Sequence, residues 1–184
     1  MRWAALLRAA NVGGRKLASA NLKRFAEELG LGEVKTLLAS GNLLFDTPEE
    51  RAATLEHMLE RASEAAFGFR AEFLLRHAGD LDTLIAANPF QEQARDRPSQ
   101  LLVHFFQRSA PPPAWVAAIT ADKVGPEALA TAGRELLIDY ADGIGRSTLG
   151  PLMAKARYRA LAGDTGVNTA RNWNTVLKLR EALG

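Results

Sequence analysis

The hydrophobic and polar positions of the chain follow strand-like and helix-like periods in turn. An apolar run over residues 3–10 leads into glycines 13–14, which predicts a buried strand followed by a loop that needs glycine dihedral angles. Ser19 is predicted to cap the start of a helix. Gly30 is predicted to end this helix, because glycine readily adopts the left-handed conformation that follows many helices. The apolar face of this helix is predicted to comprise Leu22, Phe25, Ala26 and Leu29.

A pair of strands and a second helix are predicted next. Two short apolar runs, 34–39 and 43–46, flank residues 40–42 (Ser-Gly-Asn), which predicts strands joined by a tight or bulged turn. Residues 47–50 (Thr-Pro-Glu-Glu) have the order of a helix start, with a cap, a proline at the first helical position and the Glu of a capping box. The helical period then continues to Gly68. Its apolar positions are Leu55, Met58, Leu59, Ala62 and Ala66.

The rest of the chain predicts a second series of elements after a connection. Residues 70–76 predict one more strand of the first series. Residues 78–100 contain a short helix that ends before Asn88 and then a polar stretch, which we interpret as the connection between two halves. The second series is predicted at 101–106 (strand), 112–121 (helix), 127–132 and 135–140 (strands), from near Ser147 (helix) and near 171–183 (helix). The last helix is predicted to face inward with Trp173, Val176, Leu177 and Leu183.

The order strand, helix, strand, strand, helix, strand is typical of a ferredoxin-like α+β sandwich, with helices packed on one face of an antiparallel sheet. The sequence therefore predicts two tandem ferredoxin-like repeats, with a first half at 1–78, a connecting segment at 79–100 and a second half at 101–184 that includes the C-terminal helix. The alternative is a single doubly wound parallel sheet, which the short turns between paired strands disfavour. The repeat depends on element order alone, because the halves share no detectable residue identity.

Composition excludes several classes of protein. The chain has 184 residues, 47% hydrophobic and 24% charged, which is enough for a substantial core in one unit or two small ones. No apolar run approaches the roughly 18 residues of a membrane span, and the apolar N-terminal stretch closed by Arg8 is too short for a secretion signal. The absence of cysteine excludes disulfides, thiol catalysis and iron–sulfur ligation. We expect a cytoplasmic protein with no cofactor, no metal and no membrane partner.

The charges are unevenly distributed along the chain. Residues 1–26 carry six Lys or Arg and no acid, and residues 143–184 carry seven bases and two acids. Residues 27–142 carry ten bases and 19 acids. If the two ends meet in space, they form a basic face that attracts phosphate-bearing ligands or nucleic acid. The alternative is that dispersed surface cations only keep the fold hydrated.

Five motifs, taken in order, resemble one known family. They are Arg8 with 11–14 (Asn-Val-Gly-Gly), 40–42 (Ser-Gly-Asn), 88–90 (Asn-Pro-Phe), 140–147 (Tyr-Ala-Asp-Gly-Ile-Gly-Arg-Ser) and 169–175 (Thr-Ala-Arg-Asn-Trp-Asn-Thr). In this order and spacing the chain resembles the bacterial family of domain of unknown function 1697. The resemblance implies a small cytoplasmic α+β protein of two related halves, and it implies no activity. The chain departs from the family's usual pattern at residues 9–10, at Ala18 and at Thr148, where a lysine commonly follows the serine.

Two glycine-containing segments are candidate anion sites. In 11–16, bare backbone N–H groups followed by Arg15 and Lys16 are suited to cradle an anion, although the glycines also suit a plain turn. Residues 143–148 lead into a predicted helix, whose free N–H groups favour phosphate or carboxylate, with Arg146 as a bidentate partner. The alternative is that Ser147 is only an N-cap.

The other candidates are weaker on residue type and spacing alone. Arg171 and Asn172 are predicted within the first turn of the last helix, where Arg171 either binds a ligand anion or pairs with an internal carboxylate. No nucleophile has a convincing partner, and the three histidines suit a core or solvated role. Asp139 and Asp142 beside Tyr140 suit turn positions better than a metal or base site.

The leading hypothesis is a binding module that holds a phosphorylated small molecule or a nucleic-acid backbone in a basic pocket built from both ends of the chain. The predicted ligand-binding residues are Arg8, Asn11, Gly13, Gly14, Ser40, Asn42, Arg146, Ser147, Arg171 and Asn172. One alternative is a hydrolase or transferase acting on an anionic ligand, in which Ser40 or Ser147 takes part and the arginines stabilise developing negative charge. Another is a structural or oligomeric protein whose motifs only hold turns and caps. The sequence leaves open whether the protein forms a homo-oligomer.

Overall fold

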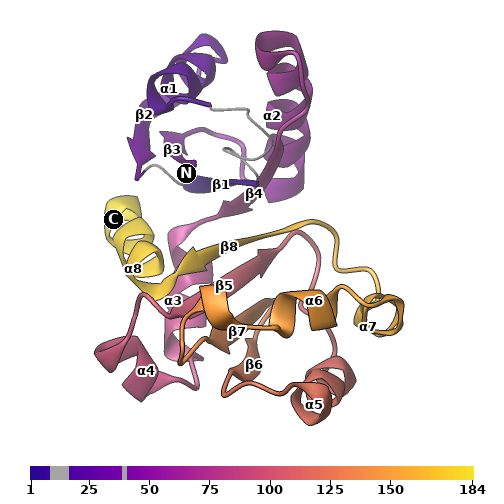
Figure 1. Ribbon diagram of the computed structural model, residues 1–184. Coiled ribbons are helices and arrows are strands. Elements are labelled where there is room, and N and C mark those ends of the chain that lie inside the picture. Colours follow the sequence, from indigo (N-terminus) through magenta and orange to yellow (C-terminus); the bar gives the residue numbers. More distant parts are fainter. Residues whose placement is uncertain (9–16, 39–40) are drawn as a thin grey trace. The chain divides into compact units, whose positions relative to one another are not determined.

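A computed structural model describes residues 1–8, 17–38 and 41–184 (Figure 1). The chain forms two compact units, each built around its own sheet. The first unit comprises Met1–Asp82 together with Lys178–Gly184, and the second unit comprises Thr83–Leu177. The last residues of the chain therefore group with the first unit, a division that the linear order of the elements does not reveal.

The first unit is a four-stranded antiparallel sheet with two helices. The strand order is β2-β3-β1-β4, and every neighbouring pair is antiparallel. Its strands are β1 (Arg2–Arg8), β2 (Gly32–Leu37), β3 (Asn42–Asp46) and β4 (Glu72–Arg76). Its helices are α1 (Ser19–Glu28) and α2 (Ala52–Phe67).

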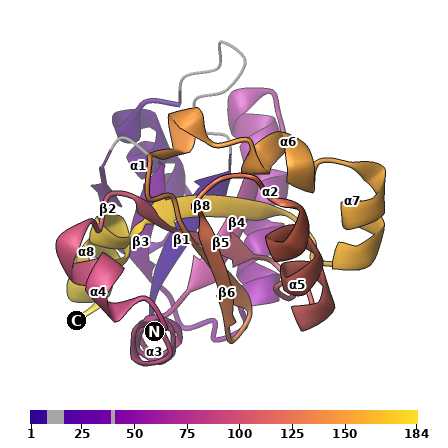
Figure 2. The same cartoon turned by 60° about the horizontal axis from the view of Figure 1, so that its bottom comes forward.

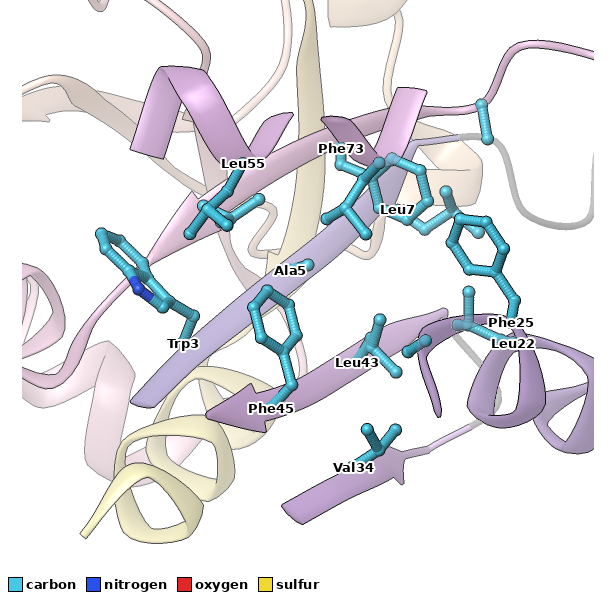
Figure 3. Close-up of a cluster of buried hydrophobic side chains, with 14 residues drawn as sticks. Trp3, Ala5, Leu7, Leu22, Phe25, Val34, Leu43, Phe45, Leu55 and Phe73 are labelled. Atoms are coloured by element: carbon cyan, nitrogen blue, oxygen red, sulfur yellow. The ribbon is translucent and has the colours of Figure 1, made fainter. Parts of the chain in front are cut away.

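The core of the first unit lies between the sheet and these two helices. Figure 3 shows Trp3, Ala5 and Leu7 along β1, directed toward the same side because alternate side chains of a strand share a face. Phe25 of α1 and Leu55 of α2 pack into the same cluster (Figure 3). The apolar periods of the sequence therefore account for this core.

The end of the chain is fixed within the first unit by polar contacts. The Arg2 Nε donates a hydrogen bond to the Ala182 carbonyl oxygen at 3.0 Å, and the Arg180 Nη2 donates to Asp82 Oδ2 at 2.9 Å. Both contacts join residues about a hundred or more positions apart to the same unit. They hold residues of the segment Lys178–Gly184 to the first unit.

The second unit repeats the strand order of the first. Its sheet has the order β6-β7-β5-β8, again antiparallel throughout. Its strands are β5 (Leu101–Phe106), β6 (Ala128–Ala132), β7 (Glu135–Asp139) and β8 (Asn168–Asn172). Its helices are α4 (Gln91–Asp96), α5 (Pro113–Asp122), α6 (Leu149–Met153) and α7 (Ala156–Ala162), while α3 (Ala78–Ala86) and α8 (Trp173–Leu183) each continue across a unit boundary.

The helices α5 and α7 lie beside each other at one side of the second sheet (Figures 1 and 2). A second core forms between the sheet and these helices, with Phe106 of β5, Trp115 and Ile119 of α5 and Tyr158 of α7 among its buried side chains. The predicted α+β fold of two similar ferredoxin-like halves, with antiparallel sheets, is confirmed. No helix of the described ranges is long and apolar enough to cross a membrane.

The helix starts predicted at Ser19 and at residues 47–50 are wrong. Ser19 is already helical, and its neighbour Ala18 is the N-cap without a side-chain hydrogen bond. The second helix begins only at Ala52 because Thr47 continues the strand pairing, with its N–H donating to the Met1 carbonyl oxygen at 3.0 Å. The Trp3 Nε1 also donates to the Glu49 carbonyl oxygen at 3.2 Å, which holds this segment against the sheet.

The predicted start of the last helix, near residue 171, is wrong. Residues 168–172 form strand β8, so Arg171 and Asn172 lie on a strand rather than in the first turn of a helix. Burial alternates along β8, but its side chains are polar or small, and the hydrophobic period therefore gives no sign of a strand. In α8, Leu177 is 43% exposed and Leu179 is buried in its place.

Two smaller predictions also differ from the structure. The polar stretch assigned to the connection contains helix α4. Ala66, predicted on the inner face of α2, is exposed, whereas Glu56 and Glu60 of the same helix are buried. The inner face of α2 is therefore partly polar, which a search for apolar positions does not detect.

Candidate functional site

A hollow of about 370 Å³ in the second unit contains the segment that the sequence singled out at 143–148. We name it the Arg146 pocket. It lies between the residues that precede β6 and those that follow β7. Its lining residues are Val124, Gly125, Pro126, Glu127, Tyr140, Asp142, Gly143, Arg146, Ser147 and Thr148.

A tight turn after β7 places the basic and hydroxyl side chains of this pocket. Gly143 has φ of +83°, a conformation that L side chains rarely adopt, and its N–H donates to the Tyr140 carbonyl oxygen at 2.7 Å. A single 3₁₀ turn follows at Ile144–Arg146, closed by the Ser147 N–H donating to the Ile144 carbonyl oxygen at 3.2 Å. The glycine thus explains the turn, and the turn presents Arg146 and Ser147 at the pocket.

A buried carboxylate forms one wall. Glu127 is 5% exposed, and the Ser147 hydroxyl donates a hydrogen bond to its Oε1. The same hydroxyl oxygen accepts a hydrogen bond from the Leu149 N–H at 3.1 Å, so both sides of this serine are engaged. A Cβ at Gly125 would overlap the Glu127 carboxylate, so glycine at this position lets the carboxylate lie where it does.

The Arg146 pocket offers a protonated hydroxyl, a guanidinium and two carboxylates, which favour hydrogen bonding to a polar ligand. Burial, with a smaller contribution from the negative charge of Glu127, raises the pKa of Tyr140 to about 12, so its hydroxyl stays protonated at neutral pH. Arg146 is exposed and forms no ion pair with any other residue in the described ranges. With Glu127 and Asp142 also present, the lining side chains do not by themselves make this pocket basic.

Two of the remaining predicted residues lie in the first unit. Arg8, at the end of β1, forms an ion pair with Glu72 of β4. Asn42, at the start of β3, is fully buried, and its Nδ2 donates to the Leu37 carbonyl oxygen at 2.8 Å. The predicted site residues Asn11, Gly13, Gly14 and Ser40 lie outside the described residues.

Arg171 and Asn172 lie on β8 of the second unit and do not line the Arg146 pocket. Arg171 is 6% exposed, and its Nη1 donates to Thr169 Oγ1 and to the Ala170 carbonyl oxygen, each at 2.8 Å. Burial lowers its pKa to about 10, which leaves the guanidinium charged at neutral pH. Asn172 caps α8, because its Oδ1 accepts from the Thr175 N–H at 3.0 Å. Convergence of all the predicted residues on one pocket stays a prediction.

Sequence reasoning missed a second hollow of the same unit, which we name the His104 cavity. Its volume is about 400 Å³, and its wall is mostly apolar and aromatic. The lining residues are His104, Phe106, Pro111, Trp115, Leu136, Met153, Tyr158, Arg159, Ala162, Gly163, Thr165 and Asn168. These residues come from separate strands, helices and loops, so no local motif marks them. In the part of the chain that the structure describes, no cluster of three or more His, Asp or Glu side chains is arranged to hold a metal ion.

Comparison with known proteins gives a family and a fold. The sequence model of the family described as protein of unknown function (DUF1697) matches residues 1–137. No curated protein matches the chain. One similar solved structure is that of the conserved bacterial protein SP0830 from Streptococcus pneumoniae, with 21% sequence identity and a TM-score of 0.70 over 100% of this chain and 98% of the other.

Proposed function

Because the chain belongs to the DUF1697 family, whose description assigns no activity, we propose a function from the geometry of the second unit: the protein binds a phosphorylated small molecule in the Arg146 pocket. The phosphate binds Arg146, and the rest of the ligand lies against Tyr140, Ser147 and Glu127. The proposal includes the cytoplasmic location that the sequence analysis predicts.

The observation that carries this proposal is the guanidinium of Arg146. It is exposed at a pocket and has no ion pair with another described residue, whereas Arg97 of the same unit donates two hydrogen bonds to Asp139, at 2.9 and 2.6 Å. A guanidinium presents its N–H groups in a planar fork that matches two phosphate oxygens. Arg146 therefore offers this fork to a ligand without first breaking an internal pair.

The two carboxylates of the pocket favour a ligand with hydroxyl or N–H groups. A carboxylate accepts hydrogen bonds and repels a second anion at short range. Glu127 and Asp142 thus suit the hydroxyl groups of a sugar phosphate or a nucleotide, with the phosphate kept at Arg146. A nucleic-acid backbone, in contrast, needs many cations along its path, and the lining of this pocket supplies one.

Calorimetric titration with three probes tests the proposal. Ribose 5-phosphate is compared with ribose and with inorganic phosphate, using the native chain and Arg146→Gln. We expect ribose 5-phosphate to bind best and to lose about 1.5–3 kcal/mol in the variant, the range for a hydrogen bond to a charged group. Lys155→Gln removes an exposed cation of the same unit that does not line the pocket, and its affinity should equal that of the native chain.

Three outcomes contradict the proposal. Equal affinity of Arg146→Gln and the native chain would remove the phosphate contact on which it depends. Tight binding of single-stranded RNA, with a salt dependence that becomes shallower in Arg146→Gln, would favour the nucleic-acid alternative. Release of inorganic phosphate from ribose 5-phosphate would favour the hydrolase alternative and would direct attention to Ser147.

A further inference from the structure

The His104 cavity has the composition of a site for an apolar small molecule. Phe106 of β5, Trp115 of α5 and Tyr158 of α7 supply aromatic wall, and Leu136 and Met153 supply aliphatic wall. Sites for small molecules are typically concave and mostly apolar, with a few polar groups that fix orientation. The polar groups here come from His104, Asn168, Thr165 and Arg159.

His104 contributes a buried nitrogen without a hydrogen-bond partner. The ring lies on β5 between Leu102 and Phe106, on the face of the sheet that packs against the second core. Its Nε2 is buried and forms no hydrogen bond in the described part of the chain. Most buried polar atoms in proteins are hydrogen-bonded, and leaving one unpaired costs free energy. A ligand group that reaches this nitrogen, with a small shift of the neighbouring cavity wall, supplies the missing partner.

The protonation of His104 defines what this partner must be. Burial lowers its pKa to about 4, and a hydrogen bond with the Asn168 side chain opposes this shift. The ring is therefore neutral at pH 7, and its Nε2 is the nitrogen without a partner. A neutral ring that donates from Nδ1 keeps a lone pair on Nε2, which accepts a hydrogen bond from an O–H or N–H group.

Arg159 adds a cation at the same cavity. It lies in the last turn of α7, is exposed, and forms no ion pair with another described residue. Its neighbour Arg157 differs, because it pairs with Asp122 and donates to the Tyr158 hydroxyl at 2.6 Å. The free guanidinium of Arg159 thus fits a carboxylate on a ligand whose body occupies the apolar part of the cavity.

We propose that the His104 cavity binds an apolar, ring-containing carboxylic acid, with its carboxylate on Arg159 and an N–H or O–H donor on His104 Nε2. This site is separate from the Arg146 pocket, because the two hollows share no lining residue. Its ligand also differs in chemistry, since most of the surface it contacts is apolar. The proposal therefore does not depend on phosphate binding at Arg146.

Three related probes test the proposal by separating the two polar contacts. Indole-3-acetate has a ring N–H and a carboxylate, naphthalene-1-acetate lacks the N–H, and indole lacks the carboxylate. Titration is followed in the full chain by the side-chain N–H resonance of Trp115, which lies in the cavity wall. We expect indole-3-acetate to bind about tenfold more tightly than either of the other probes, because each of them lacks one hydrogen-bonding group.

Variants assign each contact to its residue. Arg159→Gln should reduce the affinity for both carboxylates about tenfold and leave that for indole unchanged, whereas Arg61→Gln, an exposed arginine of the first unit, should change none. His104→Leu should remove the preference for indole-3-acetate over naphthalene-1-acetate. Thermal unfolding of each variant without probe separates lost binding from lost folding.

The proposal is overturned by either of two results in folded protein. If none of the probes shifts the Trp115 resonance, the cavity does not take such a ligand. If indole binds as tightly as indole-3-acetate and Arg159→Gln changes nothing, the carboxylate contact is absent and the cavity is an apolar void. Ribose 5-phosphate titrated in the same samples reports on the Arg146 pocket independently, so failure at one site is not mistaken for failure at the other.

Discussion

The two halves share a strand order but differ in the helical segment that follows the third strand of each sheet. In the first half this segment is α2, a single helix of 16 residues. In the second half it is α6 and α7, of five and seven residues, separated by a short break. Because the two sheets have the same topology, the halves can be compared for how the helices that cover each sheet pack against it.

The long helix α2 closes the first half with polar as well as apolar contacts. The Glu56 Oε1 accepts a hydrogen bond from the Leu75 N–H at 2.9 Å, and the Ser63 Oγ accepts from the Ala71 N–H at 2.8 Å. These side chains bond the helix to the backbone of β4 and of the residue before it. In the second half, residues of α6 and α7 line the His104 cavity instead. A shorter helical cover thus accompanies a hollow on an otherwise similar sheet.

The largest expected effect is the loss of stability when one phenylalanine is removed from each core. Phe73 of β4 is fully buried in the first core, and Phe106 of β5 is buried but lines the His104 cavity. We expect Phe73→Ala to destabilise its unit by about 4 kcal/mol and Phe106→Ala by about 2–3 kcal/mol, since cavity lining has fewer packing contacts to lose. Residue-resolved hydrogen exchange measures each unit separately. Equal losses would show that the two cores are equally well packed.

The next effect is a dependence of stability on pH that belongs to the second half. The pKa of His104 is about 4 in the folded chain and near 6.5 in an unfolded one, so the unfolded state binds the proton first as pH falls. Stability from this group is present above about pH 6.5 and is lost as pH falls to about 4, by up to about 3 kcal/mol.

Urea unfolding between pH 7 and pH 4 measures this loss. His104→Leu should remove it, and should also raise stability at pH 7 by about 1 kcal/mol because no buried nitrogen stays unpaired. His57→Gln, at an exposed position of α2, should keep the pH dependence of the native chain. A variant His104→Leu with an unchanged pH profile would contradict the assignment of the effect to His104.

A smaller effect tests the polar attachment of α2. Glu56→Ala leaves the Leu75 N–H without its acceptor in a buried environment, for which we expect a loss of about 2 kcal/mol in the first unit. Glu28→Ala removes an exposed glutamate at the end of α1 and should change stability by less than about 0.5 kcal/mol. Chemical denaturation of both variants gives the comparison. A similar effect in the two would show that the Glu56 bond adds nothing to the attachment.

The smallest effect is the difference in stability lost when the glycine that ends α2 and the glycine that ends α7 are each replaced by alanine. Gly68 has φ of +72° and ψ of +11°, which is the left-handed helical region, whereas Gly163 has φ of +70° and ψ of −157°, a region almost restricted to glycine. We expect Gly68→Ala to cost about 1 kcal/mol and Gly163→Ala about 2 kcal/mol. Thermal unfolding orders the two variants, and a larger loss at Gly68 would reverse the prediction.

The sequence predicts those elements whose burial follows an apolar period. Strand β5 is predicted with its observed bounds, because five of the six residues at 101–106 are apolar and only His104 interrupts the run. Strand β8 is missed because Asn168 to Asn172 contain no large apolar side chain, and pairing with β5 determines their conformation. The start of α2 is misplaced because the local signals at Thr47 compete with backbone hydrogen bonds to Met1, which is 46 residues away.

The two candidate sites also differ in whether the sequence reveals them. Arg146 and Ser147 are found from the sequence because a glycine turn and its functional side chains are adjacent in the chain. The His104 cavity is not found, because His104 in an apolar strand resembles a core residue in sequence. Only the folded structure shows that its Nε2 has no partner in the described part of the chain and that Arg159 lies at the same hollow.

The contact between Arg2 and Ala182 has a consequence for the order of events on the ribosome. Synthesis proceeds from the N-terminus at about 5–20 residues per second, and nascent domains generally fold as they emerge. The strands of the first sheet are complete by residue 76, and Arg2 already has Asp46 as a partner there, yet the Ala182 carbonyl that also accepts from Arg2 is made only after all of the second unit. The first sheet therefore forms early and gains its contact with Ala182 only after the second unit has been made.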